Sequence, residues 1–153
     1  MTVRSPRAPA LARRLASAMY DVLINGAVAI VATLPFLLVF GDATQGWRRH
    51  ALQAWLLAVI GAYYVWFWTH GGQTLPMKTW RIRLVRADGA AMGAGRAMHR
   101  YALAVLGLLA AGAGFAWALF DRDGQFLHDR LAGTALVESG RSNEPGTPGS
   151  PAR

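Results

Sequence analysis

Three long apolar segments, separated by short basic stretches, constrain the fold of this chain more than any other feature. They span residues 15–40, 51–69 and 101–120, and the only charged side chain within them is Asp21. A helix of about 20 residues crosses a hydrocarbon core about 30 Å thick. In lipid such a helix satisfies its own backbone hydrogen bonds, whereas in water these segments would aggregate. We therefore predict an all-α membrane protein with three hydrophobic segments.

The distribution of charge argues against a nucleic-acid partner, although the net charge of +8 would suit one. The 16 Lys and Arg residues cluster in short segments between the apolar runs, as signals of membrane topology do. No helix-turn-helix, zinc-finger or RNP-like motif is present. Because the basic side chains concentrate before residue 15 and between residues 70 and 100, the positive-inside rule places the N-terminus and that loop in the cytoplasm.

The central loop contains a strand-like pattern. In the stretch WRIRLV, apolar and basic side chains alternate, which is typical of a strand with one wet face. A second strand-like piece, TALVE, lies near the C-terminus, and a lone strand is not stable. We therefore predict a short cytoplasmic β-like pairing of residues 80–86 and 133–138.

This pairing conflicts with three simple membrane crossings, which would put residues after 120 outside the cell. The run GLLAAGAG would instead let the third segment return as a re-entrant hairpin, since glycine breaks are tolerated where protein covers the backbone. The side of the C-terminus stays open at this point. The predicted divisions are a flexible basic N-terminus (1–10), a membrane domain (11–138) and a disordered Pro/Gly/Ser-rich tail (139–153).

A polar stripe runs along the first segment. Arg14 and Asp21 are separated by seven residues, so they lie within about 20° of each other around a helix but roughly 10 Å apart along it. Ser17 and Asn25 extend the same stripe. We therefore expect Arg14 and Asp21 to face a third group or a shared cavity. A charge within a membrane helix costs up to about 3 kcal/mol, so Asp21 is either functional or a structural contact that orients the helices.

The stretch FLHDRLAGT holds the second polar group, His128 and Asp129. One His beside one Asp is weak support for metal, and the other histidines lack a matching spacing, so we expect no metal site. Asp129 could cap a helix, or pair with Arg122 or with an arginine of the central loop. Small residues spaced four apart, Gly107 with Ala111 and Ala110 with Gly114, favour close helix packing or a homo-oligomer.

The sequence shows no feature of an enzyme. It has no cysteine, nucleophile elbow, Walker loop or carboxylate pair with a plausible cleft. We expect neither catalysis nor a cofactor.

Three ordered motifs resemble the RDD family of small bacterial membrane proteins, named for one arginine and two aspartates. RRLASAMYD is similar to the opening motif, with Arg14 and Asp21 as the first two residues of the name. LHDRLAGTALV is similar to the closing motif, with Asp129 as the second aspartate. The middle section, GGQTLPMKTWRIRLVRADG followed by RAMHRYAL, departs from the family at Pro76, where a glycine is common. The resemblance covers about residues 11–138.

The resemblance implies a multi-pass protein of the bacterial inner membrane, and a transport role, including sodium–proton exchange, has been suggested for the family. Our leading hypothesis is transport or cation/proton exchange through a cluster of Arg14, Asp21 and Asp129, supported by Ser17, Asn25 and His128, in a homo-oligomer. The alternative is a non-transporting accessory or scaffold protein that docks a protein partner or anionic lipid through the basic loop.

Overall fold

The computed structural model describes residues 9–88, 92–110, 112, 117, 121 and 126–139. Most of the predicted flexible N-terminus and all but the first residue of the predicted tail, as well as Ala111 and Gly114, lie outside the described residues. The elements in chain order are α1 (Leu11–Phe40), α2 (Gly46–Thr69), α3 (Leu75–Thr79), β1 (Ile82–Arg86), α4 (Ala94–Leu109), α6 (Leu127–Leu131) and β2 (Thr134–Glu138).

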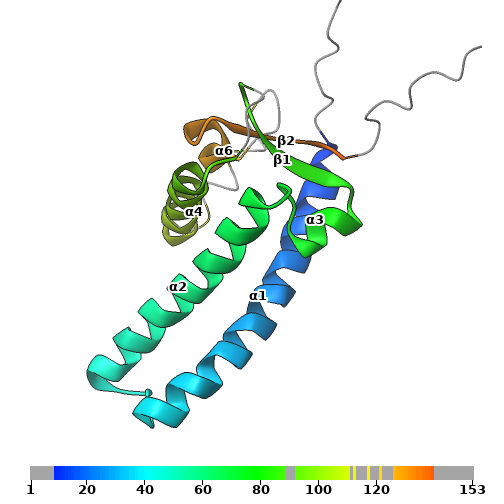
Figure 1. Cartoon of the computed structure of the whole chain (residues 1–153). Helices are drawn as coiled ribbons and strands as arrows, with labels where there is room; N and C mark the ends of the chain where they lie inside the picture. The colour runs from blue at the N-terminus through cyan, green and yellow to red at the C-terminus, as the bar shows by residue number, and fades with distance from the viewer. Residues whose placement is uncertain are drawn as a thin grey trace, which may run out of the picture.

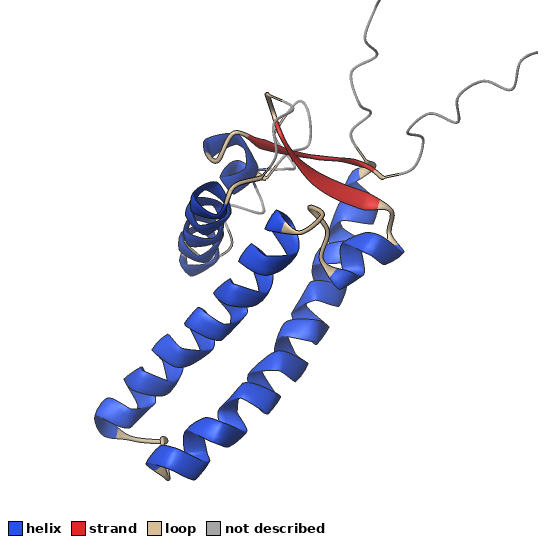
Figure 2. Cartoon of the chain, viewed as in Figure 1, coloured by secondary structure: helices blue, strands red, loops and turns tan. Residues whose placement is uncertain are grey.

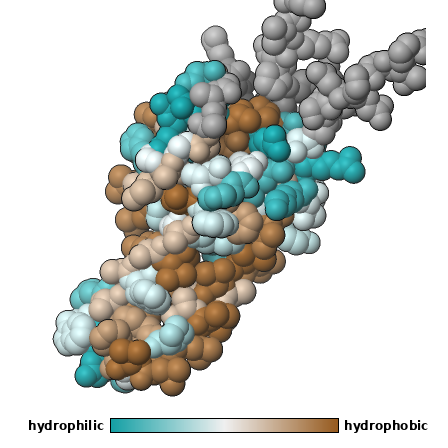
Figure 3. Space-filling view, in the orientation of Figure 1, coloured by the Kyte–Doolittle hydropathy of each residue, from teal (hydrophilic) through white to brown (hydrophobic). Residues whose placement is uncertain are grey.

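Helices α1 and α2 form a long antiparallel hairpin that projects from the rest of the molecule (Figure 1). They are the two helices of the described part that are long and apolar enough to cross a membrane. Only 11% of the most apolar window of each is buried, so they expose apolar surface as lipid-facing helices do. Figure 3 shows this surface as brown atoms along the hairpin.

Two side-chain hydrogen bonds tie the hairpin together along its length. The indole N–H of Trp55 donates to the carbonyl of Ala32 at 2.9 Å, and the amide of Asn25 donates to the hydroxyl of Tyr64 at 2.7 Å. Such bonds between helices hold their register where lipid supplies no hydrophobic driving force. The first two predicted segments are therefore present as a bonded pair of helices.

The third predicted segment is not confirmed as a membrane span. Its described start belongs to α4, a helix of 16 residues that begins seven residues earlier, at Ala94 rather than Tyr101. At 1.5 Å per residue, α4 is about 24 Å long, which is shorter than a span needs. It packs against α2 on the side away from α1, and its axis runs at a steep angle to the hairpin rather than along it (Figures 1 and 2).

The crossing point of α4 on α2 depends on a glycine. A Cβ atom at Gly61 would lie 2.8 Å from the ring of Tyr101, too close for any larger residue without a shift of that ring. The Tyr101 hydroxyl also donates to the carbonyl of Leu57 at 2.9 Å. Because Gly61 has no side chain, the ring of Tyr101 on α4 can reach the backbone of α2.

The predicted strand pairing is confirmed. β1 and β2 form an antiparallel two-stranded sheet in which Ile82 faces Glu138 and Arg86 faces Thr134. Along β1, Ile82 and Leu84 are buried while Arg83 is exposed, as the period-2 pattern requires. The buried side chains join the core beneath the sheet, which comprises Trp68, Met77, Ile82, Leu84, Ala97, Phe126 and Leu136.

The glycines after α2 bring the chain close to β1. Gly72 has a φ of +72°, and a Cβ there would lie 2.5 Å from the carbonyl oxygen of Leu84. The Leu84 N–H in turn donates to the Gly72 carbonyl at 2.7 Å. Gly72 therefore serves a close backbone approach, which any side chain would obstruct.

Because β1 and β2 are paired, residues 82–86 and 134–138 lie on the same side of any membrane that the hairpin crosses. We expect a reporter fused to the C-terminus and one inserted between Asp88 and Met92 to give the same compartment. Alkaline phosphatase and green fluorescent protein fusions measure this directly. Opposite compartments for the two fusions would contradict the pairing.

Candidate functional site

The predicted polar stripe of α1 lies on the face that the rest of the protein covers. Arg14 and Ser17 are 2% and 4% exposed. Asp21 and Asn25, further along the helix, are half-buried. The stripe therefore faces protein rather than lipid, which meets the requirement for keeping a charged side chain in an apolar helix.

Asp21 is held from one side by the segment that precedes α3. The hydroxyl of Thr74, a fully buried side chain, donates to Oδ2 of Asp21 at 3.3 Å. The same hydroxyl accepts from the N–H of Met77 and so caps the N-terminus of α3. Pro76 lies in the first turn of α3, where its missing N–H costs nothing. This turn thus carries the polar partner of Asp21.

Three oxygens along α1 are buried without a hydrogen-bond partner in the described structure: Ser17 Oγ, Asp21 Oδ1 and Asn25 Oδ1. Their residues are spaced by four, so they follow one another on the same face of the helix. Buried polar atoms normally find a partner, because leaving one unsatisfied costs about 1–3 kcal/mol. A row of acceptor oxygens that includes a carboxylate is suited to a proton or a small cation.

Asp129 is paired with an arginine of the central loop, one of the alternatives that the sequence left open. Nε of Arg100 donates to Oδ1 of Asp129 at 2.8 Å, and a second guanidinium nitrogen contacts the same oxygen. The two side chains are 6% and 1% exposed. The guanidinium also stacks over the ring of Trp68, 4.2 Å from its centroid. Arg100 thus joins α4, α6 and the end of α2.

Sequence reasoning did not single out Arg100, which it treated as one more topology-setting charge. Ala97, Arg100, Tyr101 and Ala104 share one face of α4 by their spacing, and Ala97 and Arg100 are both buried. A charged residue on the otherwise apolar face of an amphipathic helix is the sequence feature that could have identified Arg100 as a buried residue. The charge of Arg100 also acts on Asp21, so this arginine is electrostatically linked to both aspartates.

His128 lies beside this ion pair. Its ring stacks on Phe126 with centroids 5.4 Å apart, and its Nε2 is 3.7 Å from Oδ1 of Asp129. Burial, aided by the charge of Arg100 and opposed by that of Asp129, lowers the pKa of His128 from 6.5 to about 4. The imidazole is therefore neutral near pH 7. Among the described residues, no three His, Cys, Asp or Glu side chains gather to hold a metal ion.

The structure therefore sorts the predicted residues into two groups. Ser17, Asp21 and Asn25 form the polar row of α1, in which Arg14 is buried nearer the helix start. His128 and Asp129 lie in α6 and meet Arg100. Of the predicted packing residues, Gly107 is described and lies in α4.

Comparison with known proteins agrees with this arrangement of motifs. The model of the RDD family matches residues 8–133, most of the chain. No match was found among curated proteins or among solved structures.

We expect Asp129→Asn to lower the free energy of unfolding by about 3–5 kcal/mol, because it leaves the buried charge of Arg100 uncompensated. Urea titration in detergent micelles measures this change. Asp88→Asn is the matched control: Asp88 is 52% exposed and pairs with Arg86, so its loss should cost less than about 1 kcal/mol. Equal effects of the two substitutions would show that the Arg100–Asp129 pair is not a structural link.

The lowered pKa of His128 makes stability depend on pH. Since the folded-state pKa lies below the unfolded value, the unfolded chain binds more protons between pH 6.5 and about 4, and stability falls as the pH falls through this window. His128→Gln should lack this contribution, which is on the order of 3 kcal/mol. Urea titrations at pH 7 and pH 4 compare it with the wild type and with His50→Gln, an exposed control. A pH dependence unchanged by His128→Gln would refute this role.

Proposed function

This chain belongs to the RDD family, and we propose that it is a small protein of the bacterial inner membrane that exchanges a cation for a proton at Asp21. Family membership and the two exposed apolar helices together indicate a membrane protein. The exchange function is supported by one observation above all. It is the row of unpartnered buried oxygens on α1, with a carboxylate at its centre.

The chemistry of the row favours a hard cation. Hydroxyl, carboxylate and amide oxygens are the ligands that hard cations prefer. Ser17 Oγ, Asp21 Oδ1 and Asn25 Oδ1 are one of each, and because they follow one another at about 6 Å along α1, they would bind the cation in succession rather than together. A proton on the Asp21 carboxyl removes its negative charge and with it most of the attraction for the cation. The two ions therefore compete for one carboxylate, which is the requirement for exchange.

Thr74 keeps one carboxylate oxygen of Asp21 occupied. Its hydroxyl bonds Oδ2, while Oδ1 is the oxygen without a partner. The bond orients the carboxylate so that Oδ1 is the oxygen that exchanges ions. Because a neutral hydroxyl holds Asp21, the acid can change its charge without breaking an ion pair.

The position of Asp21 along α1 supports a site near one membrane surface. Asp21 precedes Phe40, the last residue of α1, by 19 residues (40 − 21), which corresponds to about 28 Å of helix. In a hydrocarbon core about 30 Å thick, the carboxylate would lie near the surface opposite the α1–α2 connector. With the N-terminus in the cytoplasm, that surface is the cytoplasmic one, and the cation would reach the other side along α1 and α2.

A pathway of this length needs more protein than one hairpin supplies, so the proposal includes a homo-oligomer. Large apolar side chains in the connector half of α1 remain exposed in the single chain, among them Leu34, Leu38 and Val39. Packing of this face against a second copy would bury them and enclose a route between the hairpins.

A second candidate function is that of an accessory protein that docks a protein partner through its basic loop. Arg81 and Arg83, at the start of the sheet, are exposed and would be available to such a partner. Exchange activity separates the two functions, since a docking protein needs no ion binding at Asp21.

We expect Asp21→Asn to reduce cation/proton exchange to the rate of protein-free vesicles, because the amide can neither bind a proton nor hold a cation's charge. A pH-sensitive dye inside proteoliposomes measures proton movement when sodium or potassium is added outside. Asp42→Asn is the matched control, because Asp42 is exposed in the connector. Exchange that persists at the wild-type rate in folded Asp21→Asn would reject the site and leave the docking function.

A further inference from the structure

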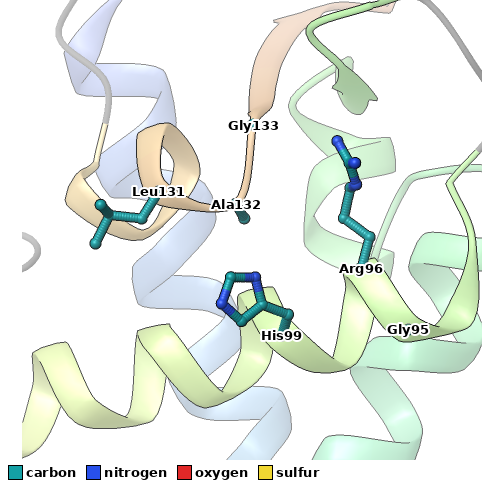
Figure 4. A pocket seen from close by; sticks show the side chains of 6 residues that line it. All are labelled: Gly95, Arg96, His99, Leu131, Ala132 and Gly133. Atoms are coloured by element: carbon teal, nitrogen blue, oxygen red, sulfur yellow. The ribbon is translucent and has the colours of Figure 1, made fainter.

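A shallow basic groove lies between α4 and the turn that follows α6. It has a volume of about 480 Å³ and is lined by Gly95, Arg96, His99, Leu131, Ala132 and Gly133. Figure 4 shows the side chains of Arg96 and His99 extending from α4 toward the Ala132–Gly133 segment. The groove is separate from the polar row of α1.

The groove has the charge of an anion site. Neither Arg96 nor His99 forms an ion pair with a described residue, and the described residues that line the groove include no acidic side chain. The guanidinium of Arg96 carries a positive charge and can bond two oxygens of a phosphate group at once, and the imidazole of His99 can donate a ring N–H beside it. Gly133 has a φ of +61°, and a Cβ there would lie 3.3 Å from a guanidinium nitrogen of Arg96. The absence of a side chain at Gly133 leaves room beside the arginine.

An apolar strip extends from the groove along the same helix. Leu103 and Leu106 follow His99 by four and seven residues, which places them one and two turns further along the same side of α4. Leu106 and Leu109 are 61% and 77% exposed. The buried Ala97 and Arg100 belong to another face of α4, turned away from this strip. The exposed side of α4 therefore has a cationic start and an apolar end.

The position of α4 brings this side to the edge of the membrane. The guanidinium of Arg100 stacks over Trp68, the last residue but one of α2, so this part of α4 lies level with that end of the hairpin. The bond from Tyr101 to the carbonyl of Leu57 attaches the same helix deeper on α2. The helix runs at a steep angle to the hairpin, whose own apolar surface is exposed. Amphipathic helices in this position lie at the boundary between headgroups and acyl chains.

We propose that the groove binds the phosphate of an anionic phospholipid, with an acyl chain along Leu103 and Leu106. The exposed apolar strip continues the lipid-facing surface of the hairpin. A lipid molecule is therefore the occupant that suits both the polar groove and the apolar strip. An anionic headgroup suits the groove better than a zwitterionic one, because the choline of phosphatidylcholine brings its own cation to Arg96. This site is independent of exchange at Asp21.

Native mass spectrometry of the purified full chain in detergent tests the proposal, with dioleoyl phosphatidylglycerol or dioleoyl phosphatidylcholine added. The wild type should retain one phosphatidylglycerol more tightly than phosphatidylcholine. The double substitution Arg96→Gln/His99→Gln should weaken phosphatidylglycerol binding about tenfold, since it removes the charge of Arg96, worth about 1 kcal/mol beside an anionic headgroup, together with the ring N–H of His99. The matched control is Arg49→Gln/His50→Gln, the same charge change at exposed residues of α2, and it should bind as the wild type does.

A third variant, Leu106→Ser, tests the acyl path while Arg96 and His99 remain. It should weaken dioleoyl phosphatidylglycerol more than the dihexanoyl form, whose short chains extend less far along α4. Three results would overturn the proposal: equal loss of lipid in both double variants, equal affinity for the two headgroups, or displacement of the lipid by inorganic phosphate at millimolar concentration.

Discussion

The buried ion pair between Arg100 and Asp129 is the interaction on which the arrangement of the head of this protein depends. It links α4 to α6, and the stacking of Arg100 on Trp68 links both to the end of α2. Two charges removed from water are stable only when they meet closely, since either one alone would carry a large desolvation cost. This requirement fixes α4 at a steep angle to the hairpin and brings α6 to the position from which β2 returns to pair with β1.

The two aspartates of the family motif meet opposite electrostatic environments. Asp129 is almost completely buried and is neutralised by a guanidinium, so its charge is structural. Asp21 is half-buried and bonded by the neutral hydroxyl of Thr74, with its second oxygen unpartnered in the described structure. An acid held by a hydroxyl can gain or lose a proton without disrupting an ion pair. This difference is why the exchange proposal rests on Asp21 alone.

Patterns that depend on local sequence were read correctly. The apolar runs ending at Phe40 and Thr69 form helices because an apolar helix satisfies its own backbone. The strand pair followed from alternation in WRIRLV and from the instability of a lone strand. The third segment is not confirmed as a span. Its described start belongs to α4, which begins at Ala94, because hydropathy alone does not register a helix whose apolar and polar residues lie on different sides. Arg100 was likewise counted only as one of the basic residues that set membrane orientation, so its pairing with Asp129 was not predicted.

The amino-acid sequence by itself determined that this chain forms apolar helices, pairs two short strands and carries a carboxylate inside its first helix. Only the tertiary structure decided which cation meets Asp129, which hydroxyl meets Asp21, and that α4 packs at a steep angle to the hairpin. The reason is physical. Helix and strand formation depends on neighbours along the chain, whereas the partner of a buried charge depends on segments that are distant in sequence and adjacent only after folding.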